Sequence, residues 1–319
     1  MRRKLYKFCV VGGASMAVVL VVMILRLLFQ SRTTIDLSER TTTNDRLQCT
    51  SVKVKSCSGF QLKEEILCVT ANMIASIDTQ RAETIVSTVP QNLSFFDVRE
   101  LKKLDILLRL FIDVCKKEKI SFMLYGGSLL GSYRHHGKIP WDDDVDILVG
   151  SKFKERLRQI IETESDWSNF LSVRTDALSQ WKVYRKVDDY WPFIDVFFYD
   201  ENQTHLWDTA PQYRGRFVYH TKDVFPLEFR LFNGLCMPVP KNIRVILEQN
   251  YDVDRCQSPS FNHLTNSRVP SKRRLNLPCN KLYAWFPFVF RNTDNHQMFS
   301  EVLKINNSII SFYKRYEKK

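Results

Sequence analysis

Four acidic residues within five positions lead directly into an apolar run, and this feature restricts the fold more than any other. The acids are Asp142, Asp143, Asp144 and Asp146. Two like charges about 4 Å apart repel by about 4 kcal/mol at an effective dielectric of roughly 20, so a fold avoids such a cluster unless cations or solvent screen it. Asp144 and Asp146 have the spacing at which side chains share one face of a β-strand. The sequence therefore predicts a strand over 145–149 that begins among carboxylates.

These carboxylates form a candidate site for a divalent cation. If the strand begins early, Asp142 lies on the same face as Asp144 and Asp146, and Asp143 points away. Mg²⁺ and Mn²⁺ prefer oxygen ligands, so two or three carboxylates on one strand face suit either ion. A solvated acidic turn is the alternative, but the apolar residues that follow immediately weigh against it.

A partner acid from a second strand would complete such a site. Asp195 is the best candidate, because it stands inside the apolar run Phe193–Phe197 and a buried carboxylate normally needs a partner. A structural ion pair is the alternative for this residue. The predicted metal ligands are Asp142, Asp144, Asp146 and Asp195, and the last three are also the predicted catalytic residues.

Small residues stand upstream of the acids, with Ser128 sixteen positions before Asp144. Gly127 and Ser128 would let the backbone approach a phosphate, with amides and a hydroxyl as donors, and a plain turn is the alternative. Basic residues nearby are candidate contacts for a phosphorylated donor, with an exposed surface role as the alternative. They are Arg134, His135, Lys138, Lys182 and Arg185. For His136 a solvated turn, and for Trp141 a place in the core, explain the residue equally well.

The periodicity of the chain predicts a mixed α/β or α+β domain. Helices are expected over 98–119, 151–164 and 241–251, the first with a capping box at Ser94 and Asp97. Strands are expected over 120–125, 182–185 and 194–198 in addition to 145–149. Asn233-Gly234 between two apolar segments predicts a two-residue hairpin.

The central run has a family resemblance. GGSLLGSYRHHGKIPWDDDVDI, followed by FIDVF and DVFPLEFRLFNGLCMPVPKNI, resembles the LicD/fukutin family of phosphotransferases over about residues 120–250. The resemblance implies a nucleotidyltransferase fold with a polymerase-β-like core. It also implies that Gly127 and Ser128 hold the nucleotide phosphates. By the same resemblance the metal-binding acids are Asp144, Asp146, Asp195 and, additionally, Asp142.

The resemblance implies a reaction as well. Family members transfer a phosphorylated alcohol, such as phosphocholine or ribitol phosphate, from a CDP-activated donor to a sugar acceptor. We therefore expect Mg²⁺ or Mn²⁺ as cofactor, a CDP-linked donor, and a glycan of a glycoprotein or glycolipid as acceptor. A catalytically inactive scaffold with the same fold is one alternative. The other is a metal-dependent glycosyltransferase, whose Asp-x-Asp signature Asp144-Val145-Asp146 also fits.

The first thirty residues predict a membrane anchor. Residues 8–25 carry no charge over 18 positions, and at about 1.5 Å per residue the segment 8–29 crosses a hydrocarbon core of about 30 Å. Cationic residues precede the segment, so the positive-inside rule leaves 1–7 in the cytosol and the rest in the lumen. A cleavable signal peptide is the alternative, although this segment is long for one and lacks a small-residue cleavage site.

The predicted organisation follows from this anchor. It is a cytosolic tail (1–7), a transmembrane signal anchor (8–29), a luminal stem (30–93) with a helix over 62–73, and a catalytic domain (94–319). This build is that of a single-pass type II protein. Together with the resemblance, it predicts a location in the Golgi membrane, with the endoplasmic reticulum as the alternative.

Two further features agree with a luminal domain. Acceptor tripeptides for N-glycosylation begin at Asn92, Asn202 and Asn306. Of eight cysteines, Cys9 lies in the anchor, and the odd number that remains leaves at least one thiol free or paired between chains, so an oligomer is possible. The net charge of +12 suits polyanions or phosphorylated ligands, but a luminal position argues against nucleic acid.

Overall fold

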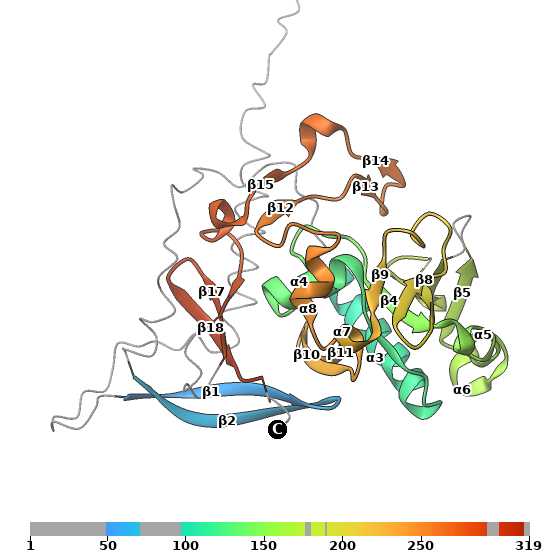
Figure 1. The fold of residues 1–319 in the computed structure, drawn as a ribbon, viewed down its shortest axis with the longest axis horizontal. Helices are drawn as coiled ribbons and strands as arrows, with labels where there is room; N and C mark the ends of the chain where they lie inside the picture. The colour runs from blue at the N-terminus through green and yellow to red at the C-terminus, as the bar shows by residue number, and fades with distance from the viewer. Residues whose placement is uncertain (1–48, 71–96, 176–179, 189, 292–299, 316–319) are drawn as a thin grey trace, which may run out of the picture.

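A mixed sheet holds the centre of the fold in the computed structural model, which describes residues 49–70, 97–175, 180–188, 190–291 and 300–315 (Figure 1). In spatial order its main strands are β3 (Phe122–Leu124), β4 (Asp146–Gly150), β7 (Phe193–Glu201), β6 (Trp181–Arg185) and β5 (Leu171–Thr175). β8 (His205–Asp208) also pairs with β7, and β9 (Val218–His220) pairs with β8. β4 and β7 are parallel, whereas the other pairs are antiparallel. The expected mixed α/β architecture is confirmed.

Helices cover this sheet. The longest is α3 (Val98–Lys117), whose buried face carries leucines, Phe111 and Cys115. Its capping box joins Asp97 and Glu100, so the cap begins three residues later than the predicted pair. The expected helix over 151–164 is divided into a 3-10 turn, η1 (Ser151–Phe153), and α5 (Lys154–Thr163). The remaining helices are α4 (Gly126–His135), α6 (Ser165–Ser168), α7 (Thr221–Val224) and α8 (Ile243–Glu248).

A second sheet joins the two ends of the described chain. Its order is β16 (Phe288–Arg291), β17 (Glu301–Ile305), β18 (Ser308–Tyr313), β1 (Cys49–Ser58) and β2 (Gln61–Thr70). β1 runs parallel to β18, and the disulfide Cys57–Cys236 links it to β11 (Leu235–Val239). Residues 49–70 therefore belong to the folded domain and not to a separate stem.

The helix expected from residue 62 is wrong, because residues 61–70 form strand β2. Its partner β1 alternates buried Val52 and Val54 with exposed Lys53, which is the period of a strand. The two valines pack with Val302 and Phe312 of the second sheet, so tertiary packing decides the conformation here. The expected tail, the expected anchor and the expected boundary at residues 93 and 94 lie outside the described residues. Within the described residues, no helix has the length and apolar character that a bilayer crossing requires.

Two β-ribbons complete the chain. β10 (Glu228–Phe232) and β11 form the predicted hairpin, and Asn233 and Gly234 at its turn have φ of 51° and 79°, a conformation these residue types tolerate. Residues 255–279 form a longer projection, which we call the arm. Its base pairs β12 (Arg255–Gln257) with β15 (Asn276–Pro278), and its tip pairs β13 (Phe261–Asn262) with β14 (Ser267–Arg268). The disulfide Cys256–Cys279 closes the base.

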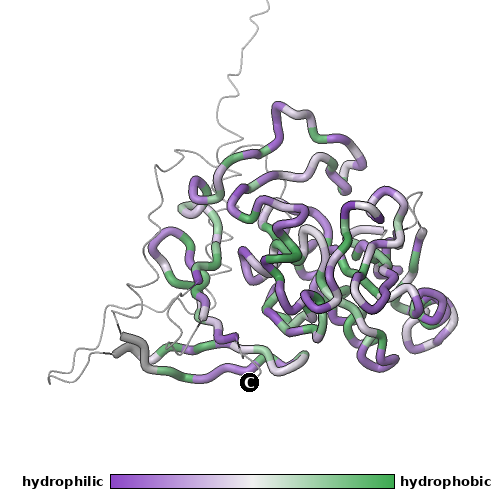
Figure 2. Tube along the Cα trace, viewed as in Figure 1, coloured by the Kyte–Doolittle hydropathy of each residue, from purple (hydrophilic) through white to green (hydrophobic). Residues whose placement is uncertain are grey.

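The main hydrophobic core lies between α3 and the central strands. Phe111 of α3 packs edge-on against Phe122 of β3, and Ile147 of β4 and Ile194 of β7 are fully buried. Figure 2 shows hydrophobic stretches gathered in these central elements, and mainly hydrophilic ones around α5 and α6. This core fixes β4 beside β7, which positions the acids described next.

Candidate active site

Three carboxylates meet where β4 and β7 begin. The parallel register places Asp146 directly opposite Asp195, and the Asp195 N–H donates to the carbonyl of Val145 at 2.8 Å. One oxygen each of Asp144, Asp146 and Asp195 lies within 4.8 Å of the other two. The structure thus brings together the three acids that the sequence places on two strands.

Burial makes this group of charges costly without a cation. Burial first, and then the neighbouring carboxylates, raise the pKa of Asp144 and of Asp146 well above the ordinary value. Hydrogen bonds from the backbone of Gly127 and of Ser128, at the start of α4, act in the opposite direction and lower the pKa of Asp146. Three hard oxygen donors of like charge, partly shielded from water, fit the ligand chemistry of Mg²⁺ or Mn²⁺.

The N-terminus of α4 holds Asp146 in place. The Gly127 N–H donates to Asp146 Oδ2 at 3.0 Å, and the Asp146 N–H donates to Ser128 Oγ at 2.8 Å. The sequence predicted a turn at these residues, whereas the helix already begins at Gly126. Gly127 and Ser128 therefore contact the acid directly.

The two glycines leave room for carboxylates. A Cβ on Gly127 would lie 2.8 Å from Asp142 Oδ2, and a Cβ on Gly126 would lie 2.9 Å from Asp146 Oδ2. Both distances are shorter than real Cβ contacts, so a side chain at either position would displace one of these carboxylates. Asp142 faces the start of α4, but it is not part of the group of three mutually close acids.

Lys182 lies beside the third acid. Its Nζ donates to Asp195 Oδ1 at 2.8 Å, because the two residues pair across the antiparallel strands β6 and β7. The ammonium also lies 3.6 Å from the centre of the Phe193 ring. Asp195 thus takes part in an ion pair and lies in the acidic group at once.

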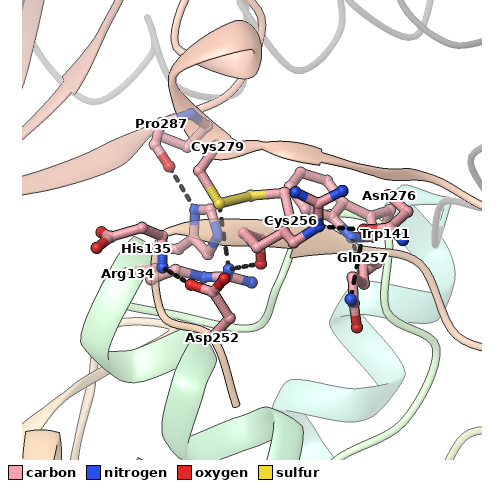
Figure 3. The surroundings of a disulfide bond; sticks show 11 residues. Arg134, His135, Trp141, Asp252, Cys256, Gln257, Asn276, Cys279 and Pro287 are labelled. Atoms are coloured by element: carbon pink, nitrogen blue, oxygen red, sulfur yellow. Dashed lines mark hydrogen bonds between the residues drawn. A yellow bond between two sulfur atoms is a disulfide. The ribbon is translucent and has the colours of Figure 1, made fainter. Parts of the chain in front are cut away.

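The structure corrects the expectation for Arg134 and His135, which lie in the interior (Figure 3). Arg134 Nη1 donates to the carbonyl of Arg255 at 3.0 Å and contacts Cys279 Sγ at 3.3 Å. His135 Nδ1 donates to the carbonyl of Pro287 at 2.6 Å, and burial lowers the pKa of its ring. The physical reason is the helix, since Arg134 lies seven residues beyond Gly127, about 10 Å along its axis.

Other basic residues near the run also serve the structure. The buried Lys138 Nζ donates to the carbonyls of Ile139 and Asp142. Arg185 pairs with Asp188 at 3.3 Å. Lys138 thus steadies the acidic segment through its backbone, and Arg185 pairs within its own turn.

The structure also decides between two possible roles for each of two further residues. Trp141 is almost fully buried, and its Nε1 donates to the carbonyl of Gln257 at 3.0 Å, which is a core role. His136, which a solvated turn explained equally well, is buried with its Nε2 2.7 Å from Glu301 Oε2.

Two residues of the site had no signal in the sequence. The tip of the arm brings His263 to Asp143, 120 positions away, and places its Nδ1 3.5 Å from Asp144 Oδ2. Asp143 lies outside the group of Asp144, Asp146 and Asp195, and its carboxylate faces this histidine, with one oxygen within 4.8 Å of an Asp144 oxygen. The Tyr251 hydroxyl lies next to Gly126, 3.4 Å from where a Cβ would stand. Both come from segments that no local pattern connects to the acids.

Comparisons with known proteins agree with this geometry. Residues 119–242 match the family model described as LicD/FKTN/FKRP, nucleotidyltransferase domain. The matched segment contains the three acids, Gly127, Ser128 and Lys182. Over this segment the chain matches a nucleotidyltransferase-type domain, and more particularly one of the LicD/FKTN/FKRP type, which confirms the resemblance.

Curated relatives match at modest identity. The chain is 27% identical over 119 residues to the lipopolysaccharide cholinephosphotransferase LicD of Haemophilus influenzae, covering 37% of this chain and 31% of that protein. It is 27% identical over 174 residues to the ribitol 5-phosphate transferase FKRP of Mus musculus and of Homo sapiens, covering 50% of this chain and 33% of those proteins. The chain spans about a third of the length of these relatives. The relatives are phosphotransferases, which supports an enzyme of this kind.

One solved structure, the lincomycin-bound lincosamide antibiotic adenylyltransferase LnuA, aligns with a TM-score of 0.33 and 15% identity. The alignment covers 50% of this chain and 90% of that protein.

Proposed function

We propose that this protein transfers a phosphorylated alcohol from a CDP-activated donor to a hydroxyl of a glycan, in a metal-dependent reaction. The observation that carries the proposal is the meeting of Asp144, Asp146 and Asp195 at the ends of two parallel strands, inside a segment of the LicD/FKTN/FKRP type. The named activities of the relatives, cholinephosphotransferase and ribitol 5-phosphate transferase, support the reaction class.

In this proposal Asp144, Asp146 and Asp195 hold Mg²⁺ or Mn²⁺, with Asp142 as an additional ligand. The ion, when bound, neutralises charge on the donor diphosphate and on the departing nucleotide. A glycan hydroxyl oxygen forms a bond to the distal phosphorus, the bond from that phosphorus to CMP breaks, and the hydroxyl proton passes to solvent. Asp195 pairs with Asp146 in the parallel register, and its carboxylate belongs to the same group of oxygens, so we assign it to ion binding and not to proton transfer.

The remaining residues position the reactants. Gly127 and Ser128 orient Asp146, and the missing Cβ of Gly127 lets carboxylates and phosphates come close to the helix N-terminus. Lys182 has three N–H donors, of which one bonds Asp195, so the others are placed to bond a phosphate oxygen. We do not assign Arg134 and His135 to donor binding, because their side chains are buried beside the arm.

The decisive experiment measures the release of CMP. Full-length protein in detergent would be incubated with Mg²⁺, candidate glycans and either CDP-choline or CDP-ribitol, with UDP- and GDP-sugars as separate arms. Release of CMP together with a mass gain of the glycan equal to the phosphorylated alcohol supports the proposal and identifies the donor. Transfer from a nucleotide sugar contradicts it in favour of a glycosyltransferase. Absence of turnover with every donor contradicts it in favour of a scaffold.

We also propose that the catalytic domain is luminal, with residues 8–29 as the membrane anchor and the Golgi as the compartment. The disulfides Cys57–Cys236 and Cys256–Cys279 support an oxidising compartment, where such bonds persist. Cys115 is a free, buried thiol, in keeping with the odd number of cysteines after the anchor.

A further inference from the structure

The acidic loop that precedes β4 has no regular structure of its own. Residues 142–145 lie outside every helix and strand, yet they carry two of the four proposed ligands. A segment without a hydrogen-bond ladder keeps a defined shape only through contacts with its surroundings. Those contacts decide whether the Asp144 carboxylate faces Asp146 and Asp195.

The arm supplies one set of these contacts at its tip. The His263 N–H donates to Asp143 Oδ2 at 2.7 Å, and His263 Nδ1 lies 2.9 Å from Asp143 Oδ1. An ionised carboxylate only accepts, so Nδ1 carries the proton of this second bond. One residue therefore holds both oxygens of a buried acid that stands directly beside Asp144.

The base of the arm supplies a second set (Figure 3). Trp141 immediately precedes the acidic loop, and its Nε1 donates to the carbonyl of Gln257. Arg134 of α4 donates to the carbonyl of Arg255 and contacts Cys279 of the disulfide. The arm thus contacts both elements of the site, α4 and the acidic loop, and the disulfide Cys256–Cys279 joins its two sides at these contacts.

We propose that His263 is a positioning residue for the metal site. Through Asp143 it holds the acidic loop so that Asp144 faces the other two ligands. The inference rests on the proposed function, because it concerns the same ion. Hydrogen-bond partners behind the ligands of a metal site typically change metal affinity or activity by about 10- to 100-fold when they are removed.

Two variants separate the hydrogen bond from the packing of the ring. His263→Asn places an amide N–H near the position of Nδ1 and removes the ring. His263→Phe removes the donor but keeps a ring between Phe193 and Phe261, which lie 5.5 and 5.2 Å from the imidazole centre. Leu264→Asn is the matched control, since this neighbouring side chain is 53% exposed.

The readouts are Mn²⁺ affinity by isothermal titration and CMP release, both on full-length protein. We expect His263→Asn and Leu264→Asn to bind Mn²⁺ like the unaltered protein, and His263→Phe to bind it about 10- to 100-fold more weakly. Normal Mn²⁺ affinity in His263→Phe would overturn the inference. So would normal Mn²⁺ affinity without CMP release in His263→Asn, because the imidazole would then act on the substrate itself. If the unaltered protein binds no Mn²⁺, the ion site of the proposed function fails as well, and the inference fails with it.

Discussion

At the scale of single residues, the role of a polar side chain depends on its burial as well as on its residue type. Asp146 lies among other acids and receives the Gly127 N–H, whereas Arg134, only a few residues from that glycine, is turned into the interior. Lys182 owes its place to its register opposite Asp195. The site is therefore defined by position and not by residue type alone.

The proposed ligand role of Asp146 predicts an asymmetric effect of Asp146→Asn. The substitution removes an ionised ligand and lessens repulsion between buried carboxylates, while its amide oxygen still accepts the Gly127 N–H. CMP release should fall by at least about 100-fold, and the melting temperature should not fall. Enzyme assays and thermal melts in metal-free buffer check both. Metal-dependent turnover that survives the change would rule out the assignment.

Two glycines of one helix predict opposite outcomes. In Gly127→Ala the new Cβ meets Asp142 Oδ2 at 2.8 Å, a side-chain atom that moves at the expense of the site. In Gly131→Ala it meets the carbonyl of Gly137 at 2.5 Å, a backbone atom that does not move without damage to the fold.

We therefore expect Gly127→Ala to lose most activity and Mn²⁺ affinity but to retain its stability, because alanine favours a helix by about 1 kcal/mol over glycine. Gly131→Ala should be destabilised, with a lower melting temperature. Comparison of thermal melts and Mn²⁺ titrations tests the pair, and a fully active Gly127→Ala would contradict the role of the close approach.

At the scale of elements, α4 is held at both ends. Its start contacts Asp146, and its end receives hydrogen bonds from Arg230 to the Ser132 carbonyl and from Arg291 to the Tyr133 carbonyl. The two arginines belong to β10 and β16, so the hairpin and the second sheet both steady the helix. Residues at the C-terminal end of the chain thereby support a site built by its centre.

The buried ion pairs at this end depend on Glu301. Burial alone would raise the pKa of this carboxyl, but Arg230, His136 and Arg291 together hold the pKa well below its ordinary value. A carboxyl whose pKa is lowered by folding contributes stability that is complete above its unfolded-state pKa of 4.5. This contribution is lost progressively as the pH falls below that value.

Glu301→Gln leaves the buried Arg230, and the more exposed Arg291, without a counter-charge. We expect the free energy of unfolding at pH 7 to fall by about 3–5 kcal/mol. The loss should shrink below pH 4.5, where the unaltered protein begins to lose this contribution itself. Denaturant titrations at pH 7 and pH 4 measure the difference. An equal loss at both pH values would show that the carboxylate charge is not the source.

At the scale of the whole molecule, the chain closes on itself. β1, at the start of the described residues, lies parallel to β18 near their end, and Cys57–Cys236 joins it to the central hairpin. A truncated form that begins at Pro90 would lose two strands and the partner of Cys236. The folded part that carries the site therefore includes residues 49–70 and 300–315 as well as the described segments between them.

The proposed luminal topology predicts glycosylation. Asn202 and Asn306 are exposed on the described surface, and each begins an acceptor tripeptide. Protein from cells should shift in mobility on treatment with an endoglycosidase, and Asn202→Gln and Asn306→Gln should each remove part of that shift. The topology would be contradicted by protein that carries no N-glycans and whose central segment is modified by cytosolic enzymes.

The sequence by itself determined the acids, the glycine–serine pair, the strands that carry or adjoin them and the hairpin at Asn233, because each is evident from local spacing. It did not determine that β1 and β2 complete the C-terminal sheet, that Arg134 is buried, or that His263 reaches Asp143. Only the tertiary structure decided these points, because each depends on contacts between segments far apart in the sequence. His263 lies 120 positions from Asp143, and Arg134 lies 121 positions from Arg255, whose carbonyl it contacts. No local periodicity records the packing that brings such segments together.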